Sequence, residues 1–269
     1  MPEFLQYDFF VNALIASLLA SVAFGIIGSY VVIKRMVFIS GGIAHTAYGG
    51  IGLGFLLGFN PLLGAMLFAV GASAFIVLLR YNENSREDSL IGIMWAMGMA
   101  LGVFFISLKE GYVPNLMGYL FGNILTIPAS ELYLMLLFDI IIVGTVTIFY
   151  KQLRAVTFDE EFASVIGLPV KKIYFGLLVL VSLTTVLLIK LVGIILVVAL
   201  LSIPASISLL YTRSLKGVMI LSILFGMLFT IVGLFLSYYL NLVSGATIIM
   251  VAVLGFILTN LHQKLKSGN

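Results

Sequence analysis

Long apolar runs alternate with short polar gaps along almost the whole chain. Nine runs carry at most one charged residue and reach the roughly 17–25 residues that a transmembrane helix needs. They cover residues 9–33, 39–59, 62–79, 90–108, 132–150, 173–189, 191–210, 218–240 and 243–261. The pattern predicts an all-α polytopic membrane protein whose residues 1–269 form one transmembrane domain. Two runs, 39–59 and 191–210, are short enough to be partial crossings, so we predict eight or nine transmembrane helices.

Positive charges lie mainly in alternate gaps between these runs. With nine spans and the N-terminus outside, 12 of the 14 Lys and Arg residues fall on the inner side, and only Lys109 and Lys190 fall outside. This bias predicts a multi-pass protein of the cell (plasma) membrane with a cytoplasmic C-terminus. The gap 109–131, which has two prolines and three glycines, is expected to be an outer loop with a re-entrant or interfacial stretch.

The composition agrees with lipid as the main solvent and excludes several classes of protein. The chain is 62% hydrophobic and 9% charged, whereas soluble domains are roughly 45–50% apolar and about 25% charged. The net charge of +3 does not indicate nucleic-acid binding, because the basic residues stand singly or in pairs. The absence of cysteine excludes disulfides and thiolate sites. With no phosphate-binding loop and no catalytic set, we predict a protein that is not an enzyme and draws energy from a partner or an ion gradient.

The longest polar gap, residues 151–172, has the pattern of a short amphipathic helix. Thr157 and Glu160 form a capping box with Thr157 as the N-cap, and Gly167 suits the position just beyond the C-terminus. The helix is expected over about residues 157–166. From the residues alone it is either an interfacial helix that spaces its neighbours or a docking helix for a cytoplasmic partner.

The glycine-rich stretch 38–58 contains His45, the one histidine within a predicted span. Glycines recur every four residues at 50, 54 and 58, a pattern that permits close approach of another helix. An imidazole within the membrane usually faces a cavity or a partner, and it is a common ligand of divalent transition metals. His45 is therefore either a metal ligand or a histidine hydrogen-bonded to a backbone carbonyl at a helix break.

Two further intramembrane features are candidates for a functional role. Asp139 lies within an apolar run, where a carboxylate is a functional candidate by default, although it could equally bond to a neighbouring threonine or helix. In the segment 192–206, Gly193 and Pro204 are expected to frame a short helix, with Pro204 breaking it and freeing carbonyls near Leu200. The alternative for Pro204 is a kinked packing helix.

Four stretches in this order resemble the ABC-3 family, the permease subunits of zinc, manganese and iron(II) ABC importers. Together they extend over essentially the whole chain. VFISGGIAHTAYGGIGLGFLLG resembles the family's GD-x-x-SHA-x-x-PG segment, and FDEEFASVIGLPV resembles FDPEFA-x-x-x-GLPV. VGIILVVALLSIPAS resembles VG-x-LLVVALL-x-x-PA, and SGATIIMVAVLGFIL resembles the terminal SGP-x-I-x-L helix. The second and third stretches together are the most specific.

The resemblance implies the type II importer fold and a homodimer with the translocation path between its subunits. It implies cytoplasmic ABC ATPase subunits that use the ATP, and an extracytoplasmic metal-binding protein that delivers zinc or manganese; the chain itself would bind no cofactor. His45, Asp139 and Pro204 would lie on the path, with His45 as the metal ligand. The helix near 157–166 would be the coupling helix seated in the ATPase. Its coupling residues would be Thr157, Phe158, Asp159, Glu160, Glu161, Phe162 and Gly167.

This chain departs from the family pattern beside the histidine. Gly41 stands where most members carry an acid, and Gly49 replaces the usual proline. His45 would then act with other oxygen donors, or the path would offer only weak ligands and pass the ion quickly. The candidate donors are Ser40, Thr46, Tyr48 and Asp139.

Two other functions remain open from the sequence. A siderophore- or corrinoid-type permease shares the architecture, although such chains usually run longer and have ten spans. A secondary transporter or channel is disfavoured, because it predicts ionisable residues in several spans and only His45 and Asp139 qualify here.

Overall fold

The computed structural model describes residues 7–81, 87–110 and 117–267, and every regular element in these ranges is helical. The elements are α1 (Asp8–Ile33), α2 (Val37–Leu57), α3 (Pro61–Arg80), α4 (Glu87–Ser107), α5 (Met117–Phe121), the 3₁₀ turn η2 (Ile124–Thr126), α6 (Ala129–Ile148), α7 (Tyr150–Phe158), α8 (Glu160–Val165), α9 (Val170–Val192), α10 (Ile194–Tyr211), α11 (Leu215–Leu240) and α12 (Ser244–Ser267). Each of the nine apolar runs forms a helix.

Eight of the described helices are long and apolar enough to cross a membrane, which confirms the predicted range of eight or nine. The ninth, α2, has a suitable length of 21 residues but carries four glycines and the polar residues His45, Thr46 and Tyr48 between positions 41 and 50. Residues 39–52 of α2 are all buried. A helix of this composition is suited to contact with protein rather than with lipid, and α2 is covered accordingly.

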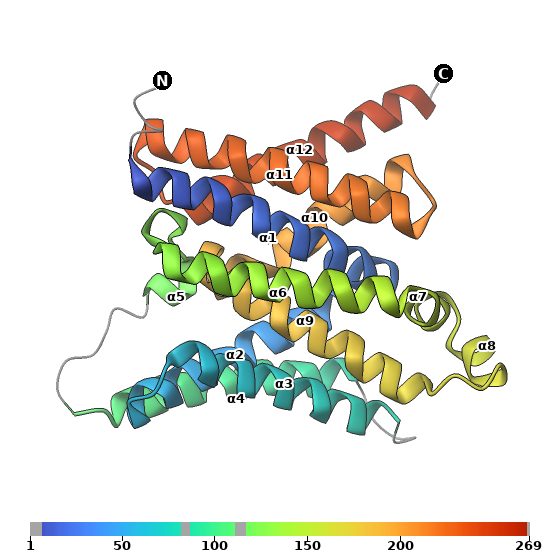
Figure 1. Cartoon of the computed structure of the whole chain (residues 1–269), viewed down its shortest axis with the longest axis horizontal. Helices are drawn as coiled ribbons and strands as arrows, with labels where there is room; N and C mark the ends of the chain where they lie inside the picture. Colours follow the sequence, from blue (N-terminus) through green and yellow to red (C-terminus); the bar gives the residue numbers. More distant parts are fainter. Residues whose placement is uncertain (1–6, 82–86, 111–116, 268–269) are drawn as a thin grey trace. The chain divides into compact units, whose positions relative to one another are not determined.

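The chain divides into two compact units, each described by itself (Figure 1). The first unit takes its described residues from 1–32, 117–144 and 187–269, and the second takes them from 33–116 and 145–186. Three of the divisions fall inside helices, namely before the last residue of α1, after Gly144 in α6 and after Val186 in α9.

In the second unit, α2 packs against α3 on one side and α4 on another (Figure 1). The closest approach is between Gly50 and Gly64, where a Cβ on Gly50 would lie 2.0 Å from the carbonyl oxygen of Gly64. The helix backbones can touch only because both residues lack a side chain, so this part of the predicted small-residue pattern is indeed a helix contact. Gly58 instead ends α2 in the left-handed conformation.

In the first unit, buried hydroxyl groups join α1, α10 and α11. Ser29 donates to Ser222, which donates to Ser208, over 3.3 and 3.1 Å. Gly193, with φ at +79°, separates α9 from α10 as expected. The expectation that Pro204 breaks the following helix is wrong, because α10 continues through Pro204 to Tyr211. A helix can carry an internal proline when the freed carbonyl finds other partners or tolerates the loss of one bond.

The gap 109–131 is irregular as predicted, in the part of it that the structure describes. It forms the five-residue α5 and the turn η2, and residues 111–116 lie outside the described ranges.

Candidate functional site

The polar segment between α6 and α9 folds into two short helices instead of the single helix expected over 157–166. Thr157 is in the last turn of α7, where its hydroxyl donates to the carbonyl of Leu153. The N-cap of α8 is Asp159, whose backbone is extended and whose carboxylate accepts a hydrogen bond of 2.8 Å from the Phe162 amide. The prediction that Thr157 is the N-cap is therefore wrong. Asp159 satisfies the same rule two residues later, and its carboxylate also suits the positive end of the helix.

The C-terminal end of α8 confirms the role expected for Gly167. Its φ is +82°, a conformation that glycine adopts without strain. The amide of Gly167 donates to the carbonyl of Ser164, and the amide of Leu168 donates to the carbonyl of Ala163. This pair of bonds is a Schellman motif, so α8 is closed at both ends by local interactions.

Glu160 fastens α8 to the rest of the second unit. Its carboxylate pairs with Lys34, which follows α1, and with the guanidinium of Arg80 at the end of α3, over 3.1 Å. Lys34 also donates to the carbonyl of Val156 in α7, over 2.7 Å. Both cations lie over the buried ring of Tyr174, with Arg80 Cζ 4.3 Å from its centroid. We call Lys34, Arg80, Glu160 and Tyr174 the anchor cluster.

We call α7 and α8 together the α7–α8 hairpin. The side of this hairpin that faces away from the anchor cluster is apolar. Phe158, Phe162, Val165 and Ile166 are all more than half exposed, and Val165 reaches 85%. Large apolar side chains gathered on a short polar segment mark a surface that contacts another protein or the membrane. The hairpin is thus fixed on one side by charge and offers a hydrophobic surface on the other.

His45 lies in the buried stretch of α2 against the only tryptophan of the chain. Trp95 on α4 stacks on the imidazole at a centroid distance of 3.9 Å and an interplanar angle of 18°. The Nδ1 atom of His45 is buried and has no hydrogen-bond partner in the described structure. The expectation of a histidine held by a backbone carbonyl through this nitrogen therefore finds no support.

Two of the other expected oxygen donors, Ser40 and Thr46, already donate their hydroxyl hydrogens to backbone carbonyls. The Ser40 hydroxyl donates to Val37, and the Thr46 hydroxyl donates to the carbonyl of Gly42 at 2.7 Å, with Met94 at 3.3 Å. Asp139 belongs to the first unit, and both of its carboxylate oxygens are buried without a hydrogen-bond partner there. Across the described ranges, no three His, Cys, Asp or Glu side chains are grouped to hold a metal ion.

Sequence reasoning missed Trp95 and the partners of Glu160. Lys34 and Arg80 were recognised only as inner-side charges, since nothing in the sequence pairs them with an acid 126 and 80 positions later. Trp95 carries no motif of its own, although a lone tryptophan inside an apolar run is a polar-edged side chain that usually has a specific neighbour.

Comparison with known proteins gives one family over nearly the whole chain. The ABC 3 transport family matches residues 6–263. A membrane protein of Synechocystis sp. is 48% identical over 259 residues, which are 96% of this chain and 92% of the relative. The manganese transport system membrane protein of Listeria monocytogenes is 34% identical over 252 residues, which are 94% of this chain and 90% of the relative.

Two solved structures are similar in fold. PsaBC from Streptococcus pneumoniae, in complex with Fab, has a TM-score of 0.87 at 32% identity and is matched over 95% of this chain and 92% of its own. An inward-facing putative metal-chelate type ABC transporter has a TM-score of 0.74 at 15% identity, with 94% of this chain and 86% of the other covered. The second likeness concerns the fold alone and confirms the expected type II ABC importer architecture.

Proposed function

Because this chain belongs to the ABC 3 transport family, we propose that it is the permease of an ATP-driven importer that carries manganese(II). The chain is a multi-pass, non-catalytic membrane subunit. Manganese is favoured over zinc because relatives named as manganese transport proteins match this chain at 32–34% identity over more than nine-tenths of its length. The metal is the transported substrate, and we propose no resident cofactor.

The observation that carries the proposal is the α7–α8 hairpin. Its exposed apolar side chains, with Phe162 and Val165 at the centre, offer a surface that a groove of an ATPase subunit could cover. Its other side is held by the anchor cluster. We propose that the ATPase moves this hairpin when it binds and hydrolyses ATP. We also propose that the coupling residues are those predicted from the sequence. Among them, Glu160 would hold the hairpin through Lys34 and Arg80 and would not contact the ATPase.

We propose that transport takes place along a path formed by two copies of the chain. The residues of this path would include His45, Asp139 and Pro204. His45 is the candidate ligand because its Nδ1 is buried and free. Imidazole suits divalent transition metals, and manganese also accepts oxygen donors. The acid expected at position 41 is a glycine here, so the ligand set of one chain is poor. A weak set is compatible with transport, since a transported ion must be released.

The remaining partners and the orientation follow the same reasoning. An extracytoplasmic metal-binding protein would deliver the ion, and cytoplasmic ATPases would act on the hairpin. The basic gaps, among them the one holding Lys171 and Lys172, would face the cytoplasm, with the N-terminus outside, in the cell membrane. Residues 1–269 would work as one permease domain.

Reconstitution into vesicles tests the proposal. The chain is purified with its ATPase, the binding protein is supplied on the outside, and uptake of manganese(II) and zinc(II) is measured with and without ATP. We expect ATP-dependent uptake of manganese. Uptake that persists without the ATPase would instead indicate a secondary transporter, and uptake only of a metal chelate would indicate the siderophore-type alternative.

The hairpin is tested in the same system with Phe162→Ala, and Leu265→Ala serves as a control because Leu265 is an exposed apolar residue at the far end of α12. Phe162→Ala should lower both ATPase binding and uptake, while Leu265→Ala should change neither. Normal co-purification of the ATPase with Phe162→Ala would contradict the assignment of the hairpin.

A further inference from the structure

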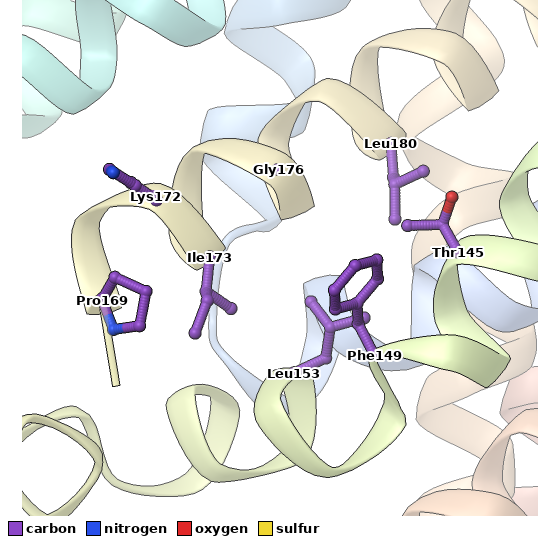
Figure 2. Close-up of a pocket in the computed structure, with 8 residues that line it drawn as sticks. All are labelled: Thr145, Phe149, Leu153, Pro169, Lys172, Ile173, Gly176 and Leu180. Carbon is purple, nitrogen blue, oxygen red and sulfur yellow. The ribbon is translucent and has the colours of Figure 1, made fainter. Parts of the chain in front are cut away.

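An apolar pocket lies in the second unit between the α6–α7 corner and the first half of α9. Its volume is about 310 Å³, at the lower end of the roughly 300–1,000 Å³ of pockets for small ligands. Figure 2 shows Phe149 and Leu153 on one side and Ile173 on the other. Lys172 lies at the edge near Pro169, with its ammonium group pointing away from the apolar side chains. The remaining lining residues are Thr145, Gly176 and Leu180.

The lining combines an apolar interior with one cation. Lys172 is the single charged residue of the pocket, it is exposed, and no carboxylate in the described ranges pairs with it. The segments that form the pocket also carry Lys151, Arg154 and Lys171. The segment between α7 and α9 carries the acids Asp159, Glu160 and Glu161, of which Glu160 is already paired with Lys34 and Arg80. The local charge at this edge is therefore positive.

We propose that this pocket is a binding site for an anionic phospholipid, with an acyl chain between α6 and α9 and the headgroup phosphate at Lys172. A gap of this size beside membrane-spanning helices loses the close contacts of a packed interior unless a flexible chain fills it. The acyl chain gains little from the pocket relative to bulk lipid, because both are apolar. Selectivity must then come from the charge at Lys172, since basic pockets between transmembrane helices recognise anionic headgroups.

Gly176 provides a way to close the pocket without disturbing the fold. It is an exposed glycine inside α9, and a Cβ built on it would meet no atom within 4 Å. The first side-chain atom of a leucine at this position therefore has open space, and its remaining atoms would take up volume at the pocket lining. Gly71 in α3 is a matched control, because it is also exposed, helical and open around its Cβ but lies outside the pocket.

The experiment measures retained lipid by native mass spectrometry of the full chain with its ATPase, titrated with phosphatidylglycerol or with phosphatidylcholine. The wild type should retain phosphatidylglycerol about fivefold more strongly than phosphatidylcholine, as expected for one lysine at the headgroup. Gly176→Leu should abolish the retained lipid, and Gly71→Leu should leave it unchanged. Lys172→Gln should remove the preference between the two lipids, while Lys266→Gln, a change of an exposed lysine near the end of α12, should not.

Three results would overturn the inference. Equal retention by the wild type and Gly176→Leu would place the lipid elsewhere. An unchanged preference in Lys172→Gln would remove the headgroup contact, and this exposed substitution is informative even if Gly176→Leu folds poorly. If the wild type retains no lipid and Gly176→Leu loses its bound ATPase, the pocket would instead be a contact site for the ATPase.

Discussion

Glu160→Gln tests whether the anchor cluster holds the α7–α8 hairpin in place. The substitution keeps the size of the side chain and removes its charge. Lys34 and Arg80 then lose their ion pairs with Glu160, and Lys34 keeps the carbonyl of Val156. Glu161→Gln is a matched control, because Glu161 is the exposed neighbour in the same first turn of α8 and removes the same charge from the helix terminus.

The expected cost lies between those of a buried and a surface ion pair. Breaking a buried pair costs roughly 3–5 kcal/mol, and an exposed pair contributes roughly 0–1 kcal/mol. The Lys34 side chain is 8% exposed, whereas those of Glu160 and Arg80 are 25% and 27% exposed. The remaining Val156 contact reduces the loss further. We expect Glu160→Gln to lower the free energy of opening the hairpin by about 2 kcal/mol. We expect Glu161→Gln to lower it by less than about 0.5 kcal/mol, because no ion pair of Glu161 within the described residues is lost.

Hydrogen exchange of the α8 amides measures this energy directly, because these amides exchange when the hairpin opens locally. The amide of Ala163, which is buried and bonded to the carbonyl of Asp159, is the natural probe. A loss of 2 kcal/mol corresponds to exchange about 30-fold faster. Amides in the centre of α2 should keep their rates in both variants.

The reasoning fails if the two variants accelerate exchange at Ala163 equally, since the effect would then come from helix-terminal charge alone. It also fails if Glu160→Gln leaves the exchange rate of the Ala163 amide unchanged. In the transport assay, Glu160→Gln should keep its ATPase bound but take up less manganese per ATP hydrolysed, and a loss of ATPase binding would show that Glu160 belongs to the docking surface instead.

Three further predictions follow from local geometry. Asp159→Ala should destabilise α8 by about 1 kcal/mol, measured by amide exchange, because it removes the N-cap; Thr157→Val should affect these amides less, and a larger effect would restore the capping role of Thr157. Gly50→Ala should lower the melting temperature through a cost of roughly 1–3 kcal/mol, since its Cβ would meet backbone; an unchanged melting temperature would contradict the close helix contact. Manganese(II), which is paramagnetic, should quench the fluorescence of Trp95 in a saturable manner, and His45→Ala should abolish this effect; equal quenching in both proteins would remove His45 from the metal path.

The sequence predicted the helices well and the contacts between them poorly. Apolar runs reveal helices because the membrane imposes length and hydrophobicity on each segment separately. The capping of α8 was misassigned because Thr157 and Asp159 are both good N-caps, and only the backbone decides between them. The predicted helix break at Pro204 is wrong, because a proline is tolerated within a helix whose freed backbone groups find other partners.

For the candidate sites too, the sequence indicates single residues and segments but not the residues that contact them. The sequence singles out His45 and the segment 157–166 as candidates because their residue types are unusual for their surroundings. Their neighbours were not found, because Trp95, Lys34 and Arg80 reach them through tertiary contacts that leave no trace in local spacing. Contacts of this kind depend on how helices pack, which a single sequence does not encode in any periodic pattern.

The polarity of α2 has a consequence for how the protein is made. Membrane insertion selects segments one at a time by hydrophobicity, and apolar residues contribute only a few tenths of a kcal/mol each in favour. With His45 and its glycines, α2 is the one apolar run that falls short of the hydropathy of the eight candidate spans. Its integration would then depend on α3 and α4 arriving to cover it, so that residues 37–107 would enter the bilayer as a group. A defect in the contact of Gly50 with Gly64 is therefore expected to lower the amount of correctly inserted protein as well as the stability of the protein that does insert.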